Sequence, residues 1–330
     1  YHAIFDKYSK YILNKDSKKD GLHFHYHPHP IKKFAHLCAT RWIGPTDKLF
    51  QVLSRRIIDR EWFPCVNRPG FQVTRPDSHW FLEQFIPFDY ASLSKKPEDE
   101  DKNQFDLSAG RSGDWRRAPI TWQPYNPSHD DYQVPGNCNR IIARSLNIGT
   151  RFCNIDQDEM DLAFKEAQES KNVLVSFADH DFRDLRKDVH QAYSYLVNSK
   201  KKYKDINFVF CEAVEGMRKA MNIRYQEKCT LDLDIKKINE KTHVLEINSS
   251  GEIFGPQPYL AIKTRDQNYH HDNLDFQIPK RKWTYTFDEE TLQLNEVEKI
   301  GVAANNSYGI TSISIFDVMK GKVSHKFLNL

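Results

Sequence analysis

The sequence predicts an α/β protein in two parts. Residues 1–224 are expected to form a parallel β-sheet with helices, open or closed into a barrel, and residues 225–330 an antiparallel, β-sandwich-like domain. Apolar runs alternate with helical patterns in the first part. Near residue 225 the pattern changes to period-two alternation, as in Thr230–Ile235, with turn signals such as Asn248–Gly251. The length of 330 residues also exceeds one typical hydrophobic core.

The first part can be divided into elements from its apolar spacing. Helical spacing predicts helices over residues 3–13, 48–61, 77–84, 156–169, 184–198 and 212–221. Apolar runs predict strands over residues 63–66, 85–90, 141–146, 172–178 and 207–211. Residues 92–139 form an irregular insertion whose Trp and Tyr content argues against disorder.

A histidine-rich stretch lies at residues 21–30. On a β-strand, His23, His25, His27 and His29 would share one face, while Leu22, Phe24 and Tyr26 would face the other side. Four imidazoles make a poor core, because each ring brings polar nitrogens that need partners. Neutral imidazole is the commonest metal ligand, so the stretch predicts a divalent-metal site. The alternative interpretation is a solvated histidine-rich loop.

The composition excludes several classes of protein. A net charge of +3 with mixed signs and no basic stripe argues against nucleic-acid binding. No apolar run approaches the roughly 20 residues of a membrane helix, so no membrane span is expected. The six scattered cysteines form no CxxC pair, which favours reduced thiols and a cytoplasmic protein. The chain begins at Tyr1 rather than Met, as expected for a fragment or a processed product.

Several short motifs occur in a fixed order. His25 and His29, like His23 and His27, are four residues apart. Further along the chain are Asn67-Arg68-Pro69-Gly70-Phe71, Asp114-Trp115 and Phe177-Ala178-Asp179-His180. In parallel sheets, functional residues gather at the carboxyl ends of strands, where several of these motifs are predicted to lie. Together they resemble the NodB-homology domain of the polysaccharide deacetylase (carbohydrate esterase) superfamily, over about residues 20–222.

The resemblance implies an irregular (β/α) barrel of the NodB type and a metal-dependent hydrolase that removes acetyl groups from a sugar or polysaccharide. It implies a divalent metal, with zinc as the expected ion, and a carbohydrate substrate. His25 and His29 are the preferred metal ligands, and His23 and His27 are the second pair. His180 would protonate the leaving group, with Asp179 or Asp181 orienting its ring. Arg68 would hold the base carboxylate, and the predicted sugar-groove residues are Trp115, Trp122 and Tyr125.

One motif of this family, an Asp-Asp-Gly sequence on the first strand, is absent. We expect it upstream of Tyr1 in a longer protein. Alternatively, Asp89, Asp179 or Asp181 completes the site, or the domain is not a working deacetylase. Two other functions stay open. A (β/α)-barrel glycoside hydrolase would need two carboxylates about 5 to 9.5 Å apart, for which Asp89 and Asp181 are candidates. An inactive barrel could serve as a carbohydrate-binding or scaffolding module. The sequence gives no indication of an oligomeric state.

Overall fold

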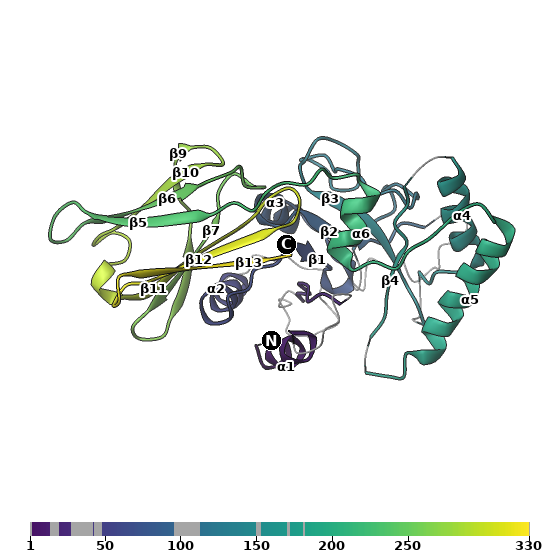
Figure 1. Ribbon diagram of the computed structural model, residues 1–330, viewed down its shortest axis with the longest axis horizontal. Helices are drawn as coiled ribbons and strands as arrows, with labels where there is room; N and C mark the ends of the chain where they lie inside the picture. Colours follow the sequence, from purple (N-terminus) through teal and green to yellow (C-terminus); the bar gives the residue numbers. More distant parts are fainter. Residues whose placement is uncertain are drawn as a thin grey trace.

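The computed structural model describes residues 2–13, 20–27, 42, 48–95, 113–149, 153–169, 172–180 and 182–329. These residues form one parallel sheet with helices and two antiparallel sheets, so the expected mixed α/β class is confirmed (Figure 1). The parallel sheet curls like half of a barrel, and the described residues do not close it into a complete (β/α) barrel. Two predicted site residues, His29 and Asp181, lie outside the described ranges.

The parallel sheet has the order β1-β2-β3-β4 among the described residues, which is also the order of these strands along the chain. Its strands are β1 (Val66–Asn67), β2 (Phe88–Ser92), β3 (Ile141–Asn147) and β4 (Ser176–Ala178). The helices of this part are α1 (His2–Leu13), α2 (Lys48–Arg60), α3 (Pro76–Phe85), α4 (Gln157–Gln168), α5 (Arg186–Lys202) and α6 (Ala213–Ala220), with a short 3-10 turn η1 (Gly70–Gln72).

The helix boundaries follow from local chemistry that the sequence displays. The Asp156 side chain accepts a hydrogen bond from the Glu159 backbone N–H at 2.9 Å and so caps α4 where the sequence places its start. The predicted strand over residues 207–211 is not formed, and this segment pairs with no strand of the described residues. Of the predicted irregular insertion, residues 92–139, Ser92 ends β2, and residues 113–139 have isolated bridges in place of helices or strands.

The histidine-rich stretch lies beside β1. The Phe24 N–H donates to the Val66 carbonyl at 3.1 Å, and the Arg68 N–H donates to the Phe24 carbonyl at 2.9 Å. The Gly70 N–H continues the pattern by donating to the Tyr26 carbonyl at 3.0 Å. The bridge between Phe24 and Asn67 is parallel, so the stretch adds to the free edge of β1.

The second part consists of two antiparallel sheets. One has the order β5-β6-β10-β9 and the other β13-β12-β11-β7-β8. The strands are β5 (Leu231–Lys237), β6 (His243–Ser249), β7 (Tyr259–Thr264), β8 (Tyr269–Asp272), β9 (Asp275–Ile278), β10 (Lys282–Phe287), β11 (Val297–Asn305), β12 (Thr311–Asp317) and β13 (Lys322–Leu328), with a 3-10 turn η5 (Leu294–Glu296) before β11. Apolar side chains of both sheets, such as Leu245 and Val302, belong to one core cluster.

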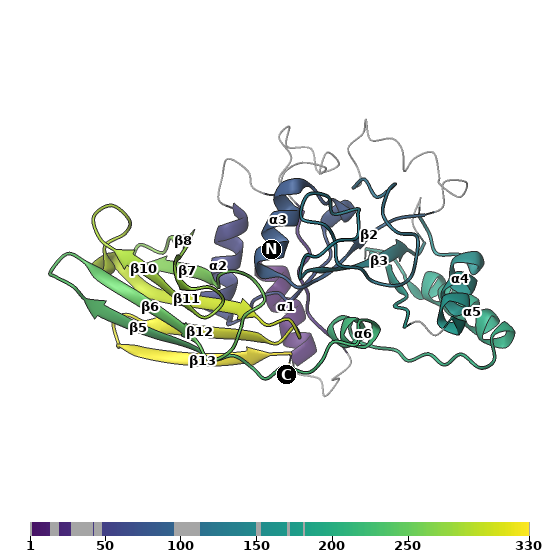
Figure 2. The same ribbon diagram turned by 90° about the horizontal axis from the view of Figure 1, so that it is seen from above.

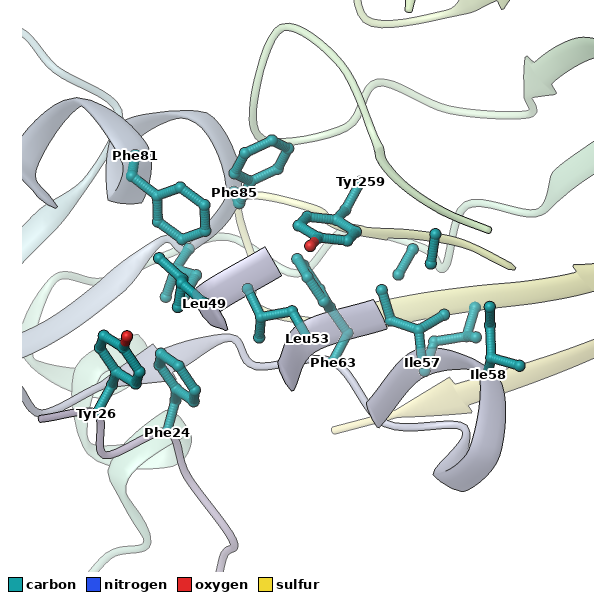
Figure 3. Packing of buried hydrophobic residues seen from close by; sticks show 14 of the residues in the cluster. Phe24, Tyr26, Leu49, Leu53, Ile57, Ile58, Phe63, Phe81, Phe85 and Tyr259 are labelled. Carbon is teal, nitrogen blue, oxygen red and sulfur yellow. The ribbon is translucent and has the colours of Figure 1, made fainter. Parts of the chain in front are cut away.

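A second core joins the two parts of the chain (Figure 3). Helix α2 packs against β7, β8 and β11, although it precedes them by some 200 residues in sequence. Its fully buried Leu53 and Ile57 lie in one cluster with Phe24 and Tyr26 of the histidine-rich stretch and with Tyr259 of β7. Figure 2 shows α2 alongside the antiparallel sheet. The predicted boundary near residue 224 is therefore crossed by a shared hydrophobic core.

None of the helices in the described ranges combines the length and the apolar character that a membrane crossing requires. The longest of them, α5, has 17 residues and ends in three lysines.

The shared core predicts that damage to α2 destabilises both parts of the chain. We expect Leu53→Ala to lower the free energy of unfolding by about 2–5 kcal/mol, because the cavity would not collapse fully. Gln51→Ala, on the exposed side of α2, is the matched control and should change it by less than about 0.5 kcal/mol. Urea unfolding followed by tryptophan fluorescence and far-UV circular dichroism would measure this. A Leu53→Ala effect as small as the control would contradict the shared core.

Candidate functional site

Two imidazole rings of the histidine-rich stretch converge. The Nε2 atoms of His25 and His27 are 2.9 Å apart, and their ring planes are nearly perpendicular. The His25 Nδ1 atom lies 2.7 Å from the Arg68 carbonyl oxygen. Since a carbonyl oxygen only accepts, Nδ1 must carry the proton, which leaves the lone pair of neutral His25 on Nε2. The Nε2–H group of His27 then donates to this lone pair, so a metal ion would have to displace the hydrogen bond between the two rings. A backbone carbonyl that fixes the tautomer in this way is typical of histidines that ligate metals.

The turn after β1 is shaped to hold the His27 ring. A Cβ atom on Gly70 would lie 2.6 Å from the ring's Cγ and Nδ1 atoms, so only glycine leaves room there. The ring packs edge to face on Phe71, at 5.1 Å between centroids. Phe71 and Gln72 have φ angles of 52° and 48°, a left-handed conformation that ordinary residues seldom adopt. Backbone strain of this kind occurs often at functional sites.

Arg68 contributes a positive charge to this site. Burial lowers the pKa of its guanidinium to about 10. Within the described part of the chain, its buried Nε atom has no hydrogen-bond partner, and its Nη1 atom lies 3.5 Å from the Pro69 carbonyl oxygen. Among the described residues no carboxylate forms an ion pair with Arg68. The side chain therefore keeps donor capacity for an anionic or carbonyl oxygen.

The electrostatics of the site favour neutral imidazoles. Although His25 keeps an exposed edge, burial of the ring, followed by the charge of Arg68, lowers its pKa to about 4. Burial and Arg68 also lower the pKa of His27. The charge of His180 contributes to both shifts, which places His180 in the neighbourhood of the pair. Neutral imidazoles retain the lone pairs that a metal ion needs.

Asp179 holds the backbone of His180 rather than its ring. One oxygen of Asp179 accepts from the His180 backbone N–H at 2.7 Å and from Arg183 at 2.6 Å. The other oxygen, Oδ2, is buried and has no hydrogen-bond partner among the residues that the structure describes. This leaves a carboxylate oxygen able to accept from a further partner or to ligate a cation.

His23 lies in a different environment from His25 and His27. Its Nε2 atom contacts Oε1 of Glu212, a half-buried carboxylate. The other oxygen of Glu212 accepts from the Val214 N–H at 2.9 Å and caps α6. Contacts with His23 and with the helix N-terminus lower the pKa of Glu212 against the effect of burial. This contact ties the histidine-rich stretch to α6.

Asp89 is committed to a buried ion pair. Asp89 and Arg140 are both fully buried and in direct contact, and Asn67 donates to the other Asp89 oxygen at 2.9 Å. Arg140 Nη2 also lies 2.6 Å from Nδ1 of His79, whose Nε2 is 2.8 Å from the Ser128 carbonyl oxygen. Both carboxylate oxygens of Asp89 therefore already accept hydrogen bonds from groups of the protein. This placement gives Asp89 a structural role, and its predicted catalytic role has no support from its contacts.

A second group of potential metal ligands combines two residues of α3 with a cysteine of the segment before β3. Donor atoms of His79, Glu83 and Cys138 lie within 4.8 Å of one another, close enough to hold a metal ion. Cys138 Sγ donates to Glu83 at 2.9 Å. Arg140 can only donate, so the His79 Nδ1 must accept, and Nε2 then donates to Ser128. Both nitrogens of His79 are thus engaged, and a cation would have to displace one of these contacts.

The predicted sugar-groove residues lie in the protein interior. Trp115 and Trp122 are 0% and 1% exposed, and their indole N–H groups donate to the carbonyls of Gln72 and Glu159 at 2.8 and 2.9 Å. Tyr125 is half-buried and donates to the Tyr132 carbonyl at 2.7 Å. These contacts give the three rings a packing role, and their predicted contact with a sugar stays a prediction.

Sequence reasoning missed three contributors to these clusters. Glu212 directly follows the apolar run 207–211, a position that could have marked it as a residue at a strand end. Glu83 lies four residues after His79 on α3, the spacing of two ligands on one helix face. No pattern in the sequence marks Arg140 as an ion-pair partner, because Asp89 is 51 residues away in the chain.

The His79 network predicts a pH dependence of stability. Burial, followed by the charge of Arg140, lowers the pKa of His79 to about 4 in the folded protein. The unfolded chain protonates this histidine near its ordinary value, so stability is complete above about pH 6.5 and falls between there and about pH 4. The loss attributable to His79 is at most about 1.4 kcal/mol per pH unit. Urea unfolding at several pH values should show a shallower decline for His79→Gln. Equal slopes would contradict the assignment.

The close approach of Gly70 to His27 predicts a specific effect on metal binding. We expect Gly70→Ala to push the His27 ring away from His25, because the new methyl group would overlap the ring. Zinc affinity measured by competition with a chromophoric chelator should fall at least about tenfold, which corresponds to about 1.4 kcal/mol. Gly321→Ala is the control for loss of a glycine: its φ of 60° strains an alanine, but its Cβ would meet no atom within 4 Å, so the variant tests backbone strain without a steric overlap. An unchanged affinity in a folded Gly70→Ala variant would contradict this geometry.

Comparison with known proteins provides no relative. No protein-family model matches the chain, and neither a curated protein nor a solved structure matches it.

Proposed function

We propose that this chain is a metal-dependent hydrolase that removes acetyl groups from a sugar or polysaccharide. The observation that carries the proposal is the convergence of the His25 and His27 Nε2 atoms, with His25 oriented by the Arg68 carbonyl. Convergent neutral imidazoles with an outer hydrogen bond are the usual protein part of a zinc site. The order of the sequence motifs supports acyl hydrolysis as the chemistry.

The residues that would hold the ion are His25 and His27, with the buried Oδ2 of Asp179 or the predicted ligand His29 as a third donor. A bound divalent ion such as zinc would supply Lewis-acid polarisation of an acyl carbonyl and lower the pKa of a ligated water to about 7. Catalytic zinc sites have three protein ligands and keep the fourth coordination position open for water or substrate.

The chain's own groups would serve the remaining steps. Arg68, a half-buried cation whose Nε has no hydrogen-bond partner among the described residues, would bind the acyl oxygen or orient a carboxylate base. His180 would donate a proton to the departing amine or alkoxide, because it is exposed and near the imidazole pair. Asp179 would keep His180 in place through its backbone contact.

A second candidate function is a carbohydrate-binding or scaffolding module without catalysis. The described residues supply no carboxylate partner for Arg68. Its guanidinium therefore keeps donors for a ligand oxygen, which favours a binding function. The glycoside hydrolase has less support, since Asp89 is fully buried in its ion pair with Arg140. Metal content and acetate release together separate these functions.

We expect purified protein to bind about one equivalent of zinc and the His25→Ala/His27→Ala variant to lose it, measured by elemental mass spectrometry after dialysis. The matched control is His243→Ala/His270→Ala, which removes two imidazoles from β6 and β8 and should keep the metal. The zinc-loaded protein should release acetate from N- or O-acetylated oligosaccharides, and Arg68→Gln should lower that rate at least about 100-fold.

Three results would count against the proposal. Absence of bound zinc in the wild type, or its retention in the His25→Ala/His27→Ala variant, would remove the proposed metal site. Zinc binding without acetate release from any acetylated oligosaccharide would favour the binding module.

A further inference from the structure

A large apolar cavity separates β4 from the connection between α5 and α6. Its volume is about 930 Å³. Its walls come from α4, α5, residues 172–178 and residues 206–213, and are mostly aliphatic or aromatic, as with Phe164, Leu196 and Val175. We refer to residues 206–211 as the strap. Protein interiors are close-packed, so we expect a segment of the chain or an apolar ligand to fill a cavity of this size and apolar character.

The strap has the composition of a buried strand but is not buried. Its sequence, Ile-Asn-Phe-Val-Phe-Cys, is typical of strands in a parallel sheet, which are covered on both faces. In the structure Phe208, Val209 and Phe210 are 39%, 68% and 76% exposed. Figure 2 shows this connection as an extended coil that runs from α5 to α6 apart from the sheet. Three consecutive exposed apolar residues are unusual on a protein surface without a partner.

The edge of β4 that points away from β3 has no partner strand among the described residues. β4 pairs with β3 through Ser176, Phe177 and Ala178, and among the described residues no strand covers its other edge. Phe177 is 42% exposed. An uncovered edge presents unpaired backbone N–H and C=O groups to any extended segment nearby.

The connections of the strap fit a return to this edge. The sheet adds its strands in chain order, each parallel to the last, so the next strand is expected beside β4. Helix α5 then provides the crossover that a parallel pair requires. The far end of the strap is already beside the sheet, because Tyr90 of β2 donates to the Ala213 carbonyl at 2.5 Å.

We propose that residues 207–211 pair in parallel with β4 and close the cavity, so that the structure shows the strap in an open position. Closure extends the sheet by one strand and covers the apolar walls with Phe208, Val209 and Phe210. The contact between Glu212 and His23 joins the end of the strap to the histidine-rich stretch, so closure also constrains that stretch. The inference does not rest on the proposed function.

Hydrogen exchange of the wild-type protein, followed by mass spectrometry, tests the proposal. Pairing with β4 should make alternate amides within residues 208–211, those that point toward β4, exchange at least about 100-fold more slowly than the amides of the exposed connection 224–228, which is the internal control. Protection of less than about tenfold would overturn the proposal. Protection that appears only after a fatty acid such as palmitate is added would also overturn it, because the cavity would then be a ligand site.

Disulfide trapping identifies the register of the pair. In a Cys211→Ser background, Phe177→Cys is combined in turn with Phe208→Cys, Val209→Cys and Phe210→Cys. Paired strands lie about 4.8 Å apart, within the Cα separations that a disulfide bridges. One of the three variants should crosslink under mild oxidation, whereas Phe177→Cys with Phe276→Cys of β9 should not. Failure of all three pairs alongside unprotected strap amides would overturn the proposal independently of the ligand test.

Discussion

The parallel pairing of the histidine-rich stretch with β1 is the constraint on which the candidate site depends. Three backbone hydrogen bonds fix residues 24–26 in register with residues 66–70. Because side chains alternate along an extended chain, this register sends Phe24 and Tyr26 into the core shared with α2. The same register places His25 and His27 on the opposite side, over Gly70 and beside Arg68. Packing on one face therefore determines the geometry of the polar face.

The polar clusters around Asp89 and around His25 differ in how their charges are balanced. Around Asp89 the charges are compensated, since Arg140 and Asn67 satisfy the carboxylate in the interior. Arg68 and Arg140 each have a buried Nε without a hydrogen-bond partner among the described residues, so the difference lies in the counter-charge. Around His25 the charge of Arg68 is uncompensated, because no carboxylate of the described residues forms an ion pair with it. A partly buried charge without a counter-charge costs stability, and proteins retain such charges where function requires it. This contrast favours the His25 cluster over the Asp89 cluster as the functional one.

The sequence predicted features that depend on local pattern and missed those that depend on a distant partner. Period-two alternation was enough to separate His25 and His27 from Phe24 and Tyr26, and the Asp156 cap was visible in the local spacing. The ion pair of Asp89 with Arg140 was not, because a buried charge pair leaves no periodic signal. Trp115 and Trp122 are a second example. Both are buried, but no periodic pattern in a loop tells whether a tryptophan lies in the core or on a binding surface. The preferred ligand pair, His25 with His29, stays a prediction because His29 lies outside the described residues.

The metal site is tested by X-ray absorption fine structure at the zinc edge of the zinc-loaded protein. If His25 and His27 hold the ion, the spectrum will show a first shell of nitrogen and oxygen at about 2.0–2.1 Å, with the outer scattering of two imidazole rings and no sulfur. A sulfur scatterer at about 2.3 Å would place the ion beside Cys138 in the His79 cluster and contradict the proposed site.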